Sequence, residues 1–587
     1  MNSRRLSSGL ILILLSVILA GCAGARERSF KVSEDWSRGN RIGTTSIRQP
    51  VALAADNEGA YLTWPVKTED ATRLDYVRLG PDGLVITDTI LALTTIFPQS
   101  PQLLAGDDLH LFLVTRVESG QLDGVYHVPL SRDGQVLSEP QRLSGDDQKV
   151  GDVVARQAPN GDMHLVWDVI EGPGVGVYHG RLDPDGALVG FPQLIGPDGH
   201  RPSAQFGADG TLHLAWMLPV GASRQDIYYT SLAPGAEVSN DPVRVADPRI
   251  SSTDLESAPV LAVDGSDVAI FWSVEHRTGL AAGSAELSNV TFPADDPDLQ
   301  VIQTIHVPDE AKPRYQQIDR FAPADHVAVP AEGDVWTGFI EMPQTLPWSG
   351  SGVAVLANMT YDFRVNPRSQ LGLLVVENGQ LAAYQQPALT RQFSLHPTGA
   401  VSPDGQLHAA WIDLESPGEY SVYYASTRPG VVAALDQRTG NDTFNDTVDL
   451  AWGMASGLTL LPLSIIAALP IIVVMGIYYI TGHDGSLRGN LGAQFALVVA
   501  LVLYLTTKLI IMGGLLDRPP FMNVVPESFA IAWAWIVSVA IAGIALVSML
   551  IYIRRNKRPE LLKAALLFFA VDALMTLLLY GPTFYGE

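Results

Sequence analysis

Charged side chains follow several segments of the type Leu-His-Leu-x-Trp, at points where a predicted strand gives way to a loop. Two carboxyl groups there could cleave a glycosidic bond if they converged to roughly 5 to 9 Å, and acids beside histidine and arginine could also hold a polar ligand. The candidates are Asp168, Glu171, Glu275, His276, Arg277, Asp413 and Glu415. The sequence shows no recognisable nucleophile, metal-ligand set or cofactor motif beside them, so we assign no catalytic residue, metal or cofactor.

The elements that must position these side chains form a repeat. Each unit has an apolar strand, an Asp-Gly or Asn-Gly turn, a Trp-bearing strand, and a strand ending in Tyr-Tyr or Tyr-His. Seven units with spacings of 49 to 72 residues align on Trp64, Leu113, Trp167, Trp216, Trp272, Phe339 and Trp411. Such a period, with several short strands per unit, is typical of propeller blades. We predict an all-β, seven-bladed β-propeller over residues 41–430, with six or eight blades as alternatives.

The order of strands within a blade follows from their composition. Small-residue segments such as 51–54 and 259–262 suit the crowded innermost position, and 242–245 suits the outer edge, where proline is tolerated. The last unit lacks a fourth strand, whereas residues 41–45 precede the first innermost strand. We predict that they complete the last blade and close the ring. The loops after the Trp strands then share a face with the entries into the innermost strands, and that face carries the seven candidates.

Four histidines stand three positions before the aligned aromatic position, at His110, His164, His213 and His408. Equivalent positions in different blades lie in different wedges of the ring, so these imidazoles cannot converge on one metal ion. We interpret them as buried core residues that donate hydrogen bonds to backbone.

Residues 1–21 are predicted to be an export signal, with basic residues before an apolar segment at 10–20 and Leu-Ala-Gly-Cys at 19–22. This ending resembles the lipobox of bacterial lipoproteins, and the resemblance implies a mature chain that begins at lipidated Cys22. An uncleaved signal anchor is the alternative. Cys22 is the only cysteine, which excludes an intramolecular disulfide and a cysteine metal site. Residues 22–40 are predicted to be a linker.

The charge and hydropathy of the chain change near residue 450. The first 450 residues hold 30 basic and 56 acidic side chains, a net of −26, which argues against nucleic-acid binding. After a predicted linker at 431–454, apolar stretches near 455–480, 491–516, 529–553 and 561–580 can each cross a bilayer. They predict a bundle of four transmembrane helices over 455–587. The basic cluster at 554–558 favours a cytoplasmic loop, which puts the propeller outside a bacterial plasma membrane.

Two ionisable residues lie within these apolar stretches, Lys508 in the second and Asp572 in the fourth. Both are about eight to ten residues from the outer ends of their helices, hence at similar depth. An unpaired charge there is costly, so we expect the two to pair across the bundle; the alternative is that Lys508 reaches outward alone and Asp572 is protonated. Pro462 and Pro470 predict kinks in the first span.

The repeated units resemble sialidase-like propellers with Asp-box (BNR-type) repeats over about 380 residues. An Asp box runs Ser-x-Asp-x-Gly-x-Thr-Trp, whereas here five residues separate Asp-Gly from Trp, as in 209–216. The family contains exo-glycosidases and non-enzymatic relatives. Its catalytic arginines, Tyr/Glu pair and acid Asp match no residues here one by one, so none is carried over.

The sequence leaves three functions open. The favoured one is a binding or assembly module for a protein, peptide or glycan, held at the membrane by lipid and helices. The second is a glycoside hydrolase or lyase acting on surface polysaccharide, with Glu171, Glu275, Asp413 and Glu415 as the carboxylates. The third is a subunit of a membrane complex with a membrane-protein partner, in which the four helices do the main work through Lys508 and Asp572 and the propeller is a docking platform.

Overall fold

The computed structural model describes residues 28–69, 71–93, 95–221, 223–236, 241–251, 253–279, 281–307, 322–323, 339–348, 350–363, 366–513, 519–520 and 529–584. The predicted export signal and Cys22 lie outside these residues. Contacts within the chain define two compact units, one of residues 25–363 and 367–437 and one built on residues 438–587.

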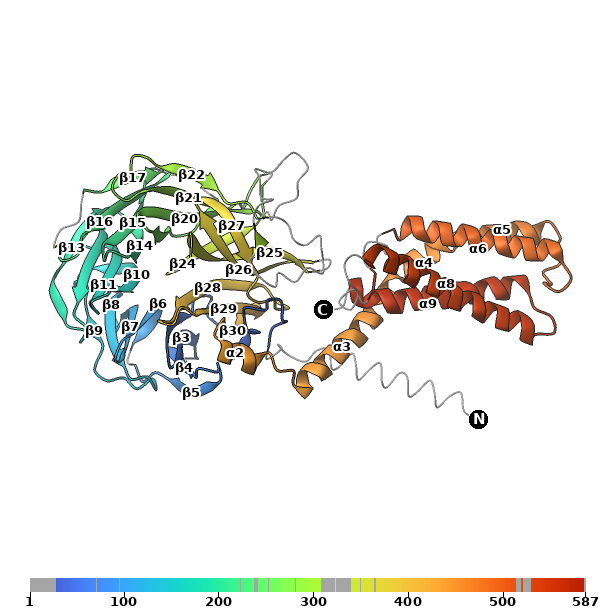
Figure 1. The fold of residues 1–587 in the computed structure, drawn as a ribbon, viewed down its shortest axis with the longest axis horizontal. Helices are drawn as coiled ribbons and strands as arrows, with labels where there is room; N and C mark the ends of the chain where they lie inside the picture. The colour runs from blue at the N-terminus through green and yellow to red at the C-terminus, as the bar shows by residue number, and fades with distance from the viewer. Residues whose placement is uncertain are drawn as a thin grey trace. The chain divides into compact units, whose positions relative to one another are not determined.

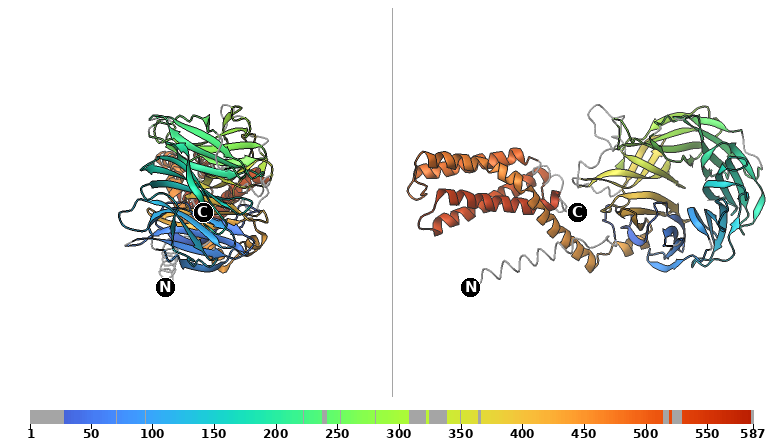
Figure 2. Two further views of the ribbon diagram at one scale, coloured as in Figure 1. Left: turned by 90° about the vertical axis from the view of Figure 1, so that its left-hand side faces the viewer. Right: turned by 180° about the vertical axis from the view of Figure 1, so that it is seen from behind.

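The first unit is a ring of seven antiparallel sheets (Figure 1; Figure 2 shows the ring from behind). The first blade has β2 (Ala52–Asp56), β3 (Gly59–Lys67), β4 (Thr72–Leu79) and β5 (Val85–Ile90). The second has β6 (Ile96–Ala105), β7 (Leu109–Arg116), β8 (Gly124–Leu130) and β9 (Gln141–Arg142). The third has β10 (Lys149–Gln157), β11 (Met163–Glu171), β12 (Gly176–Leu182) and β13 (Leu188–Pro197). The fourth has β14 (His200–Phe206), β15 (Leu212–Pro219), β16 (Gln225–Leu232) and β17 (Val243–Ala246).

The remaining three blades depart from the simple four-strand order. In the fifth, β18 (Leu255–Glu256) and β19 (Val260–Asp264) both pair with β20 (Asp267–Glu275), followed by β21 (Ala285–Pro293) and β22 (Val301–Thr304). The sixth runs β24 (Ile340–Leu346), β25 (Val353–Phe363), β26 (Asn366–Glu377) and β27 (Gln380–Gln385), with β23 (Ala322–Pro323) at its edge. The seventh runs β28 (Ser394–Val401), β29 (Leu407–Ser416), β30 (Glu419–Ser426) and β1 (Asn40–Thr45). The predicted seven-bladed propeller is confirmed.

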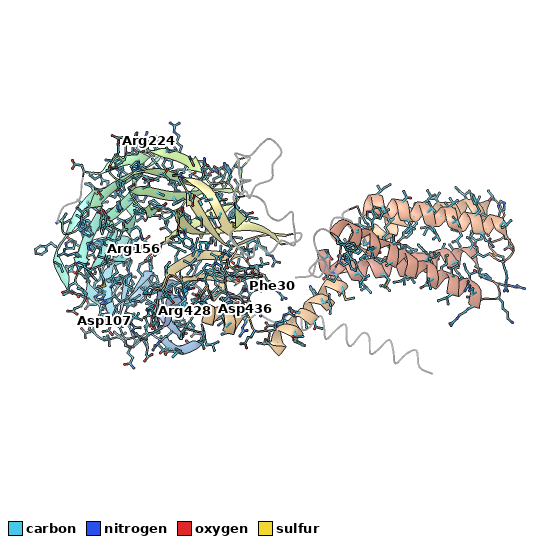
Figure 3. All side chains as sticks on the ribbon, viewed as in Figure 1. Phe30, Asp107, Arg156, Arg224, Arg428 and Asp436 are labelled. Carbon is cyan, nitrogen blue, oxygen red and sulfur yellow. The ribbon has the colours of Figure 1, made fainter. Side chains whose placement is uncertain are left out.

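The ring closes as predicted, because β1 pairs with β30 from Asn40↔Tyr424 to Thr45↔Tyr420. Parts of the two segments that the sequence suggested as linkers, residues 28–39 and 431–435, are also ordered against the propeller. Trp36 is 1% exposed and donates its indole N–H to Gln385 Oε1 at 3.1 Å. The helix α2 (Pro429–Leu435) follows β30, and the labelled residues Phe30 and Asp436 in Figure 3 lie where the N-terminal segment meets this helix. These segments extend the propeller unit beyond its strands.

Aromatic pairs hold the second and third strands of several blades together. The rings of Trp167 and Tyr178 stack with centroids 6.0 Å apart, and those of Trp411 and Tyr423 with centroids 5.6 Å apart. These tryptophans are almost fully buried. Large rings fill the gaps between wedge-shaped sheets, which is why Trp recurs at this position.

One position of the repeat alignment was wrong. Phe339 does not lie on a second strand; it immediately precedes β24, the innermost strand of the sixth blade, and forms a bridge to Ala285. The second strand of that blade is β25, which packs aliphatic residues such as Leu356 in place of a tryptophan. The alignment therefore placed an aromatic residue beside the innermost strand at a position that belongs to the second strand.

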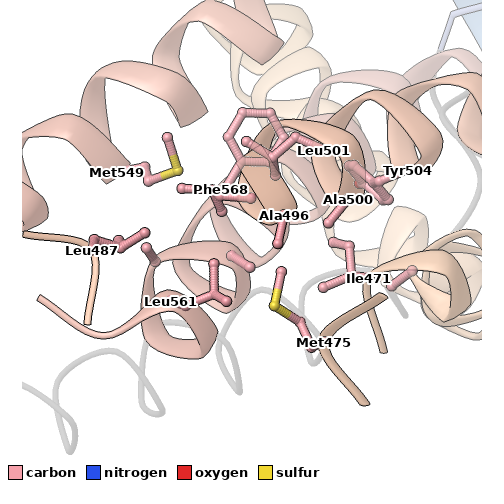
Figure 4. Packing of buried hydrophobic residues seen from close by; sticks show 14 of the residues in the cluster. Ile471, Met475, Leu487, Ala496, Ala500, Leu501, Tyr504, Met549, Leu561 and Phe568 are labelled. Atoms are coloured by element: carbon pink, nitrogen blue, oxygen red, sulfur yellow. The ribbon is translucent and has the colours of Figure 1, made fainter. Parts of the chain in front are cut away.

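The second unit contains α3 (Gly440–Ser456), the 3₁₀ turn η1 (Gly457–Leu460), α4 (Leu461–Ala467), α5 (Leu469–Ile480), α6 (Leu491–Ile511), α8 (Ala530–Arg555) and α9 (Leu561–Phe584). Among the described residues, four helical stretches are long and apolar enough to cross a membrane. The first begins at Gly440, earlier than predicted, and it is broken before Pro462 and Pro470 as predicted. Small residues such as Ala496 and Ala500 let α6 pack closely in the bundle core (Figure 4).

Candidate functional site

Five of the seven blades have a β-bulge where the innermost strand enters the ring. The register with the second strand shifts in β6, β10, β14, β24 and β28, near the start of each. The residues at the bulges, which we name the entry ring, are Ser100, Asp152, Arg201, Met342 and His396. In four of them φ is positive, between 47° and 53°, although none is glycine. Such backbone costs of order 1 to 3 kcal/mol each and is typical of functional sites, and a bulge re-aims the side chain that it carries.

Proline follows the bulge residue in four of these five blades, at Pro101, Pro202, Pro343 and Pro397. Proline has no N–H, so it fits a place where the ladder between strands is interrupted. The side chains of all four prolines are buried. The bulge and its proline are therefore a repeated part of the blade and not an irregularity of one strand.

Asp168 joins the entries of the third and fourth blades. Its Oδ1 accepts the backbone N–H of Asp152 at 2.6 Å, and its Oδ2 accepts the backbone N–H of Arg201 at 3.0 Å. The residue is 3% exposed. Bulges leave backbone donors without ladder partners, and a buried carboxylate that accepts two of them forms strong, charge-assisted hydrogen bonds. Asp168 thus fixes two members of the entry ring.

A cavity of about 530 Å³ lies at these two entries. Its polar lining residues are Ser100, Asp152, Asp168, Asp198, His200 and Arg201. This volume is within the range of sites that hold small ligands. The cavity brings together donors, acceptors and both signs of charge on the face to which the sequence assigned the ligand.

Carboxyl groups around the cavity have perturbed protonation. Burial raises the pKa of Asp152 to about 6, and a hydrogen bond with Ser100 opposes the shift. Burial raises the pKa of Glu256, on β18, to about 7, with Arg201 opposing. The guanidinium of Arg201 donates instead to the backbone oxygen of Glu256 at 2.9 Å. Both Glu256 carboxyl oxygens are buried with no hydrogen-bond partner among the described residues.

The other side of the entry ring has a similar mixture. Burial lowers the pKa of His396 to about 4, and the positive charge of Arg48 acts in the same direction. Burial raises the pKa of Glu341, with Glu275 adding to the shift and Arg48 opposing it. The backbone N–H of Met342 donates to Ser273 Oγ at 3.2 Å. Thus Ser273, on the second strand of the fifth blade, supports a bulge of the next blade much as Asp168 does.

The remaining sequence candidates are spread over three blades. Glu171 is exposed and 3.7 Å from Lys149. Arg277 Nε lies 3.4 Å from Glu275 Oε1, and His276 Nδ1 lies 3.4 Å from Asp254 Oδ2. None of these residues lines the cavity, which among the seven candidates contains Asp168 alone.

Asp413 and Glu415 lie together on β29 of the seventh blade. Asp413 is 1% exposed and accepts the Ser394 hydroxyl at 2.9 Å. Burial raises its pKa to about 7, and hydrogen bonds with Thr390 and Ser394 oppose the shift. Glu415 accepts the Ser421 hydroxyl at 2.6 Å. The four carboxylates proposed for glycan cleavage therefore come from three blades, and each has its own local partners.

Sequence reasoning missed Asp152, Arg201 and Glu256. The sequence does mark the bulges, because an X-Pro dipeptide recurs at the start of the innermost strands, as in Ser100-Pro101 and Arg201-Pro202. The prediction used only the residues that follow each tryptophan, and these lie in the loops at the rim. Glu256 precedes Pro259 by three residues and needed the tertiary structure to be recognised.

His110, His213 and His408 are buried and His164 is partly buried. Their partners are side chains of the third strand and not backbone. His110 Nδ1 lies 3.0 Å from His127 Nε2, and His408 Nδ1 lies 2.7 Å from the Tyr424 hydroxyl. Burial lowers the pKa of His408 to about 4, so its ring is neutral. In the part of the chain that the structure describes, no group of three or more His, Cys, Asp or Glu residues could hold a metal ion.

In the helical unit, Lys508 and Asp572 lie side by side. Lys508 Nζ donates to Asp572 Oδ2 at 2.7 Å and to Thr576 Oγ1 at 2.7 Å, and the Tyr504 hydroxyl donates to the same Asp572 oxygen at 2.7 Å. Asp572 is fully buried and Lys508 is 7% exposed. The ion pair thus links α6 to α9 inside the bundle.

Several solved structures are similar to the propeller unit. An ulvan lyase of polysaccharide lyase family PL25 aligns over 65% of this chain and 93% of its own, with 10% identity and a TM-score of 0.42. The polysaccharide lyase Uly1 aligns over 64% and 89%, with 10% identity and a TM-score of 0.42. The sialidase of Trypanosoma rangeli aligns over 71% and 62%, with 9% identity and a TM-score of 0.36. At such identities the likeness concerns the fold alone. No family model and no curated protein sequence matches the chain.

Proposed function

We propose that the chain is a membrane-anchored, extracytoplasmic binding module that captures a protein, peptide or glycan at the entry ring of its propeller. The observation that carries the proposal is the repeated bulge with positive φ at non-glycine residues. Strained backbone of this kind persists only when the surrounding structure enforces it. Here Asp168 and Ser273 supply that enforcement by accepting the freed backbone donors.

The chemistry of the entry ring supports binding of a polar ligand. Arg201 is exposed, and its guanidinium offers a planar set of donors beside the carboxyl of Asp152 and the ring of His200. The surface of the first 450 residues is acidic, which favours uncharged or basic ligands over polyanions. The topology inferred from the basic cluster at 554–558 puts this face outside the cell, and the lipobox resemblance adds an anchor at Cys22.

Glycan cleavage at the same face is the second candidate function. Asp152 and Glu256 have pKa values of about 6 and about 7. A carboxyl such as Glu256, which stays partly protonated near neutral pH, is suited to general acid catalysis. This version replaces the rim carboxylates considered from the sequence with two acids near the cavity.

Binding is tested with the full chain in lipid nanodiscs on glycan and peptide arrays. Arg201→Ala and Asp152→Asn should each weaken capture of the identified ligand at least tenfold, since each removes a charged group from the cavity. Asp298→Asn is the matched control, because Asp298 is exposed in the turn between β21 and β22, away from the entries. Equal capture by all three variants would refute the proposal. Release of a shortened glycan by wild type, lost in Glu256→Gln, would instead support the enzyme.

A further inference from the structure

A second cavity, of about 700 Å³, lies between the third and fourth blades at the opposite ends of their strands. Its lining includes the turns at 158–162 and 208–210, which connect the innermost and second strands of these blades. We name it the turn-face groove. Strand topology separates it from the entry ring, because β10 runs from the bulge at one end to this turn at the other.

An aromatic ring is presented over this groove by a bulge in β13. His179 pairs with Gln193 and Arg181 pairs with Val189, so that Gly180 alone opposes three residues, 190 to 192. Gly190 has φ of +76°, and Phe191 is 91% exposed. A bulge re-aims side chains, and here it turns a phenylalanine out of the blade onto the wall of a cavity. Such exposure of a large ring has no packing benefit within the propeller.

The floor of the groove is polar and combines two histidines with the charged side chains of Arg181, Asp162 and Asp209. His164 Nδ1 lies 2.9 Å from His179 Nε2. Burial lowers the pKa of His164 to about 4 and that of His179 to about 3, so these imidazoles are uncharged near neutral pH. Because each ring uses one nitrogen in the bond between them, the pair leaves one donor and one acceptor for a ligand. The guanidinium of Arg181 lies 4.0 Å from the carboxylate of Asp162, so that its charge is balanced within the groove.

Two glycines, Gly180 and Gly190, leave space in the groove because they have no side chain. A Cβ on Gly180 would lie 3.0 Å from the Trp167 ring, so a larger residue would disturb the stacked core of the blade. A Cβ on Gly190 would meet nothing within 4 Å, so the chain beside Phe191 is open. The groove thus combines one exposed aromatic face, neutral hydrogen-bonding groups and a balanced ion pair.

We infer that the turn-face groove is a binding site for an uncharged glycan, with a sugar ring packed on Phe191 and its hydroxyls bonded to the neutral imidazoles and to the Asp162–Arg181 pair. A pyranose has an apolar face of C–H groups and a rim of hydroxyls, which matches an aromatic wall beside mixed donors and acceptors. A polyanion would meet the acidic surface of the protein and the carboxylate of Asp209, and a basic peptide would find that single carboxylate as its one unbalanced anionic partner among the lining residues. This inference is independent of the entry ring.

The test is isothermal titration and saturation-transfer NMR on the full chain in nanodiscs. The probes are the uncharged hexasaccharides of cellulose, xylan, β-1,3-glucan and mannan, with an oligogalacturonate and a proline-rich decapeptide for comparison. At least one uncharged hexasaccharide should bind, and Phe191→Ala should weaken its binding about 2- to 13-fold, the effect of removing one well-packed aromatic contact. Phe191→Trp should retain binding. Because Phe191 is exposed, neither variant disturbs folding.

Leu299→Ala is the matched control, since Leu299 is a large apolar side chain, 62% exposed, on the fifth blade. It should bind the hexasaccharide as wild type does. The inference is overturned if no uncharged hexasaccharide binds, if only the oligogalacturonate or the peptide binds, or if Phe191→Ala and Leu299→Ala bind equally. If Arg201→Ala loses binding and Phe191→Ala does not, the sugar binds at the entry ring. That result would overturn the inference that the groove binds it and would support the proposed function.

Discussion

Replacing Asp168 by alanine should destabilise the propeller through the loss of two specific hydrogen bonds. The carboxylate accepts the backbone N–H of Asp152 at 2.6 Å and that of Arg201 at 3.0 Å. A hydrogen bond to a charged group contributes about 1.5 to 3 kcal/mol, so the pair contributes about 3 to 6 kcal/mol. The adjoining cavity admits water to the freed donors, which favours the lower end of this range. We expect a loss of about 3 kcal/mol.

Two further variants make the reasoning quantitative. Asp168→Asn keeps the shape and one accepting oxygen but turns an NH₂ group toward the second donor, so it should lose about half as much as alanine. Glu171→Gln, three residues further along the same strand, removes an exposed carboxylate 3.7 Å from Lys149, and exposed pairs contribute about 0 to 1 kcal/mol. It should leave stability within about 0.5 kcal/mol of wild type.

The assay is urea unfolding of the full chain in mild detergent, followed by tryptophan fluorescence, since Trp167 is the residue next to Asp168. The free energies come from linear extrapolation. The reasoning is refuted if Asp168→Ala and Glu171→Gln lose the same stability, or if alanine costs less than asparagine. Either result would mean that the bulges hold their shape without the carboxylate.

Three other predictions concern the helices, the histidines and the closure of the ring. Lys508→Met should reduce the yield of monodisperse protein on gel filtration, because breaking a buried ion pair costs about 3 to 5 kcal/mol. The double variant with Asp572→Leu should recover most of the wild-type yield. If it does not, the pair has a role other than stabilising the bundle. Burial lowers the pKa of His408 to about 4 in the folded state, whereas an unfolded histidine has a pKa of about 6.5. As the pH falls below about 6.5 the unfolded state binds the proton first, so the free energy of unfolding decreases by about 1.4 kcal/mol per pH unit until the pH reaches about 4. In His408→Gln the slope of unfolding free energy against pH should be smaller by one proton in this range, and an unchanged slope would refute this. Deleting β1 (Asn40–Thr45) should leave the β30 edge open and cause aggregation on gel filtration, whereas an equally soluble ring would contradict the closure.

The ring could be predicted from the sequence because a bulky side chain recurs on the second strand for a geometric reason. Trp167 and Trp411 stack on tyrosines of the third strand and fill the widening space between blades. The sixth blade fills the same space with aliphatic residues of β25, among them Leu356, so no aromatic marks it and Phe339 was misaligned. The closure of the ring was predictable because the last blade lacks a fourth strand in the sequence, whereas one extra strand precedes the first blade.

The site could be predicted only in part, because bulges depend on contacts between blades. Asp168 was found from its place after Trp167, yet its partners lie on β10 and β14 and appear only once the blades are assembled. The raised pKa of Glu256 likewise follows from burial, which outweighs the opposing charge of Arg201. The guanidinium of Arg201 donates to the backbone oxygen of Glu256 and not to its carboxyl. No local pattern encodes that choice.

The asymmetry of the entry ring bears on what it can bind. In the fifth blade the innermost strand is divided into β18 and β19, and the short first piece carries Glu256 where five other blades carry a bulge. Arg201 stands between this acid and Asp152, while His396 and Met342 occupy the other side of the ring. A ring of seven similar units would present the same group in every direction. Because the charged bulge residues, Asp152 and Arg201, lie in adjacent blades, we expect a bound ligand to have one preferred orientation, and variants at Arg201 should change affinity far more than variants at Met342.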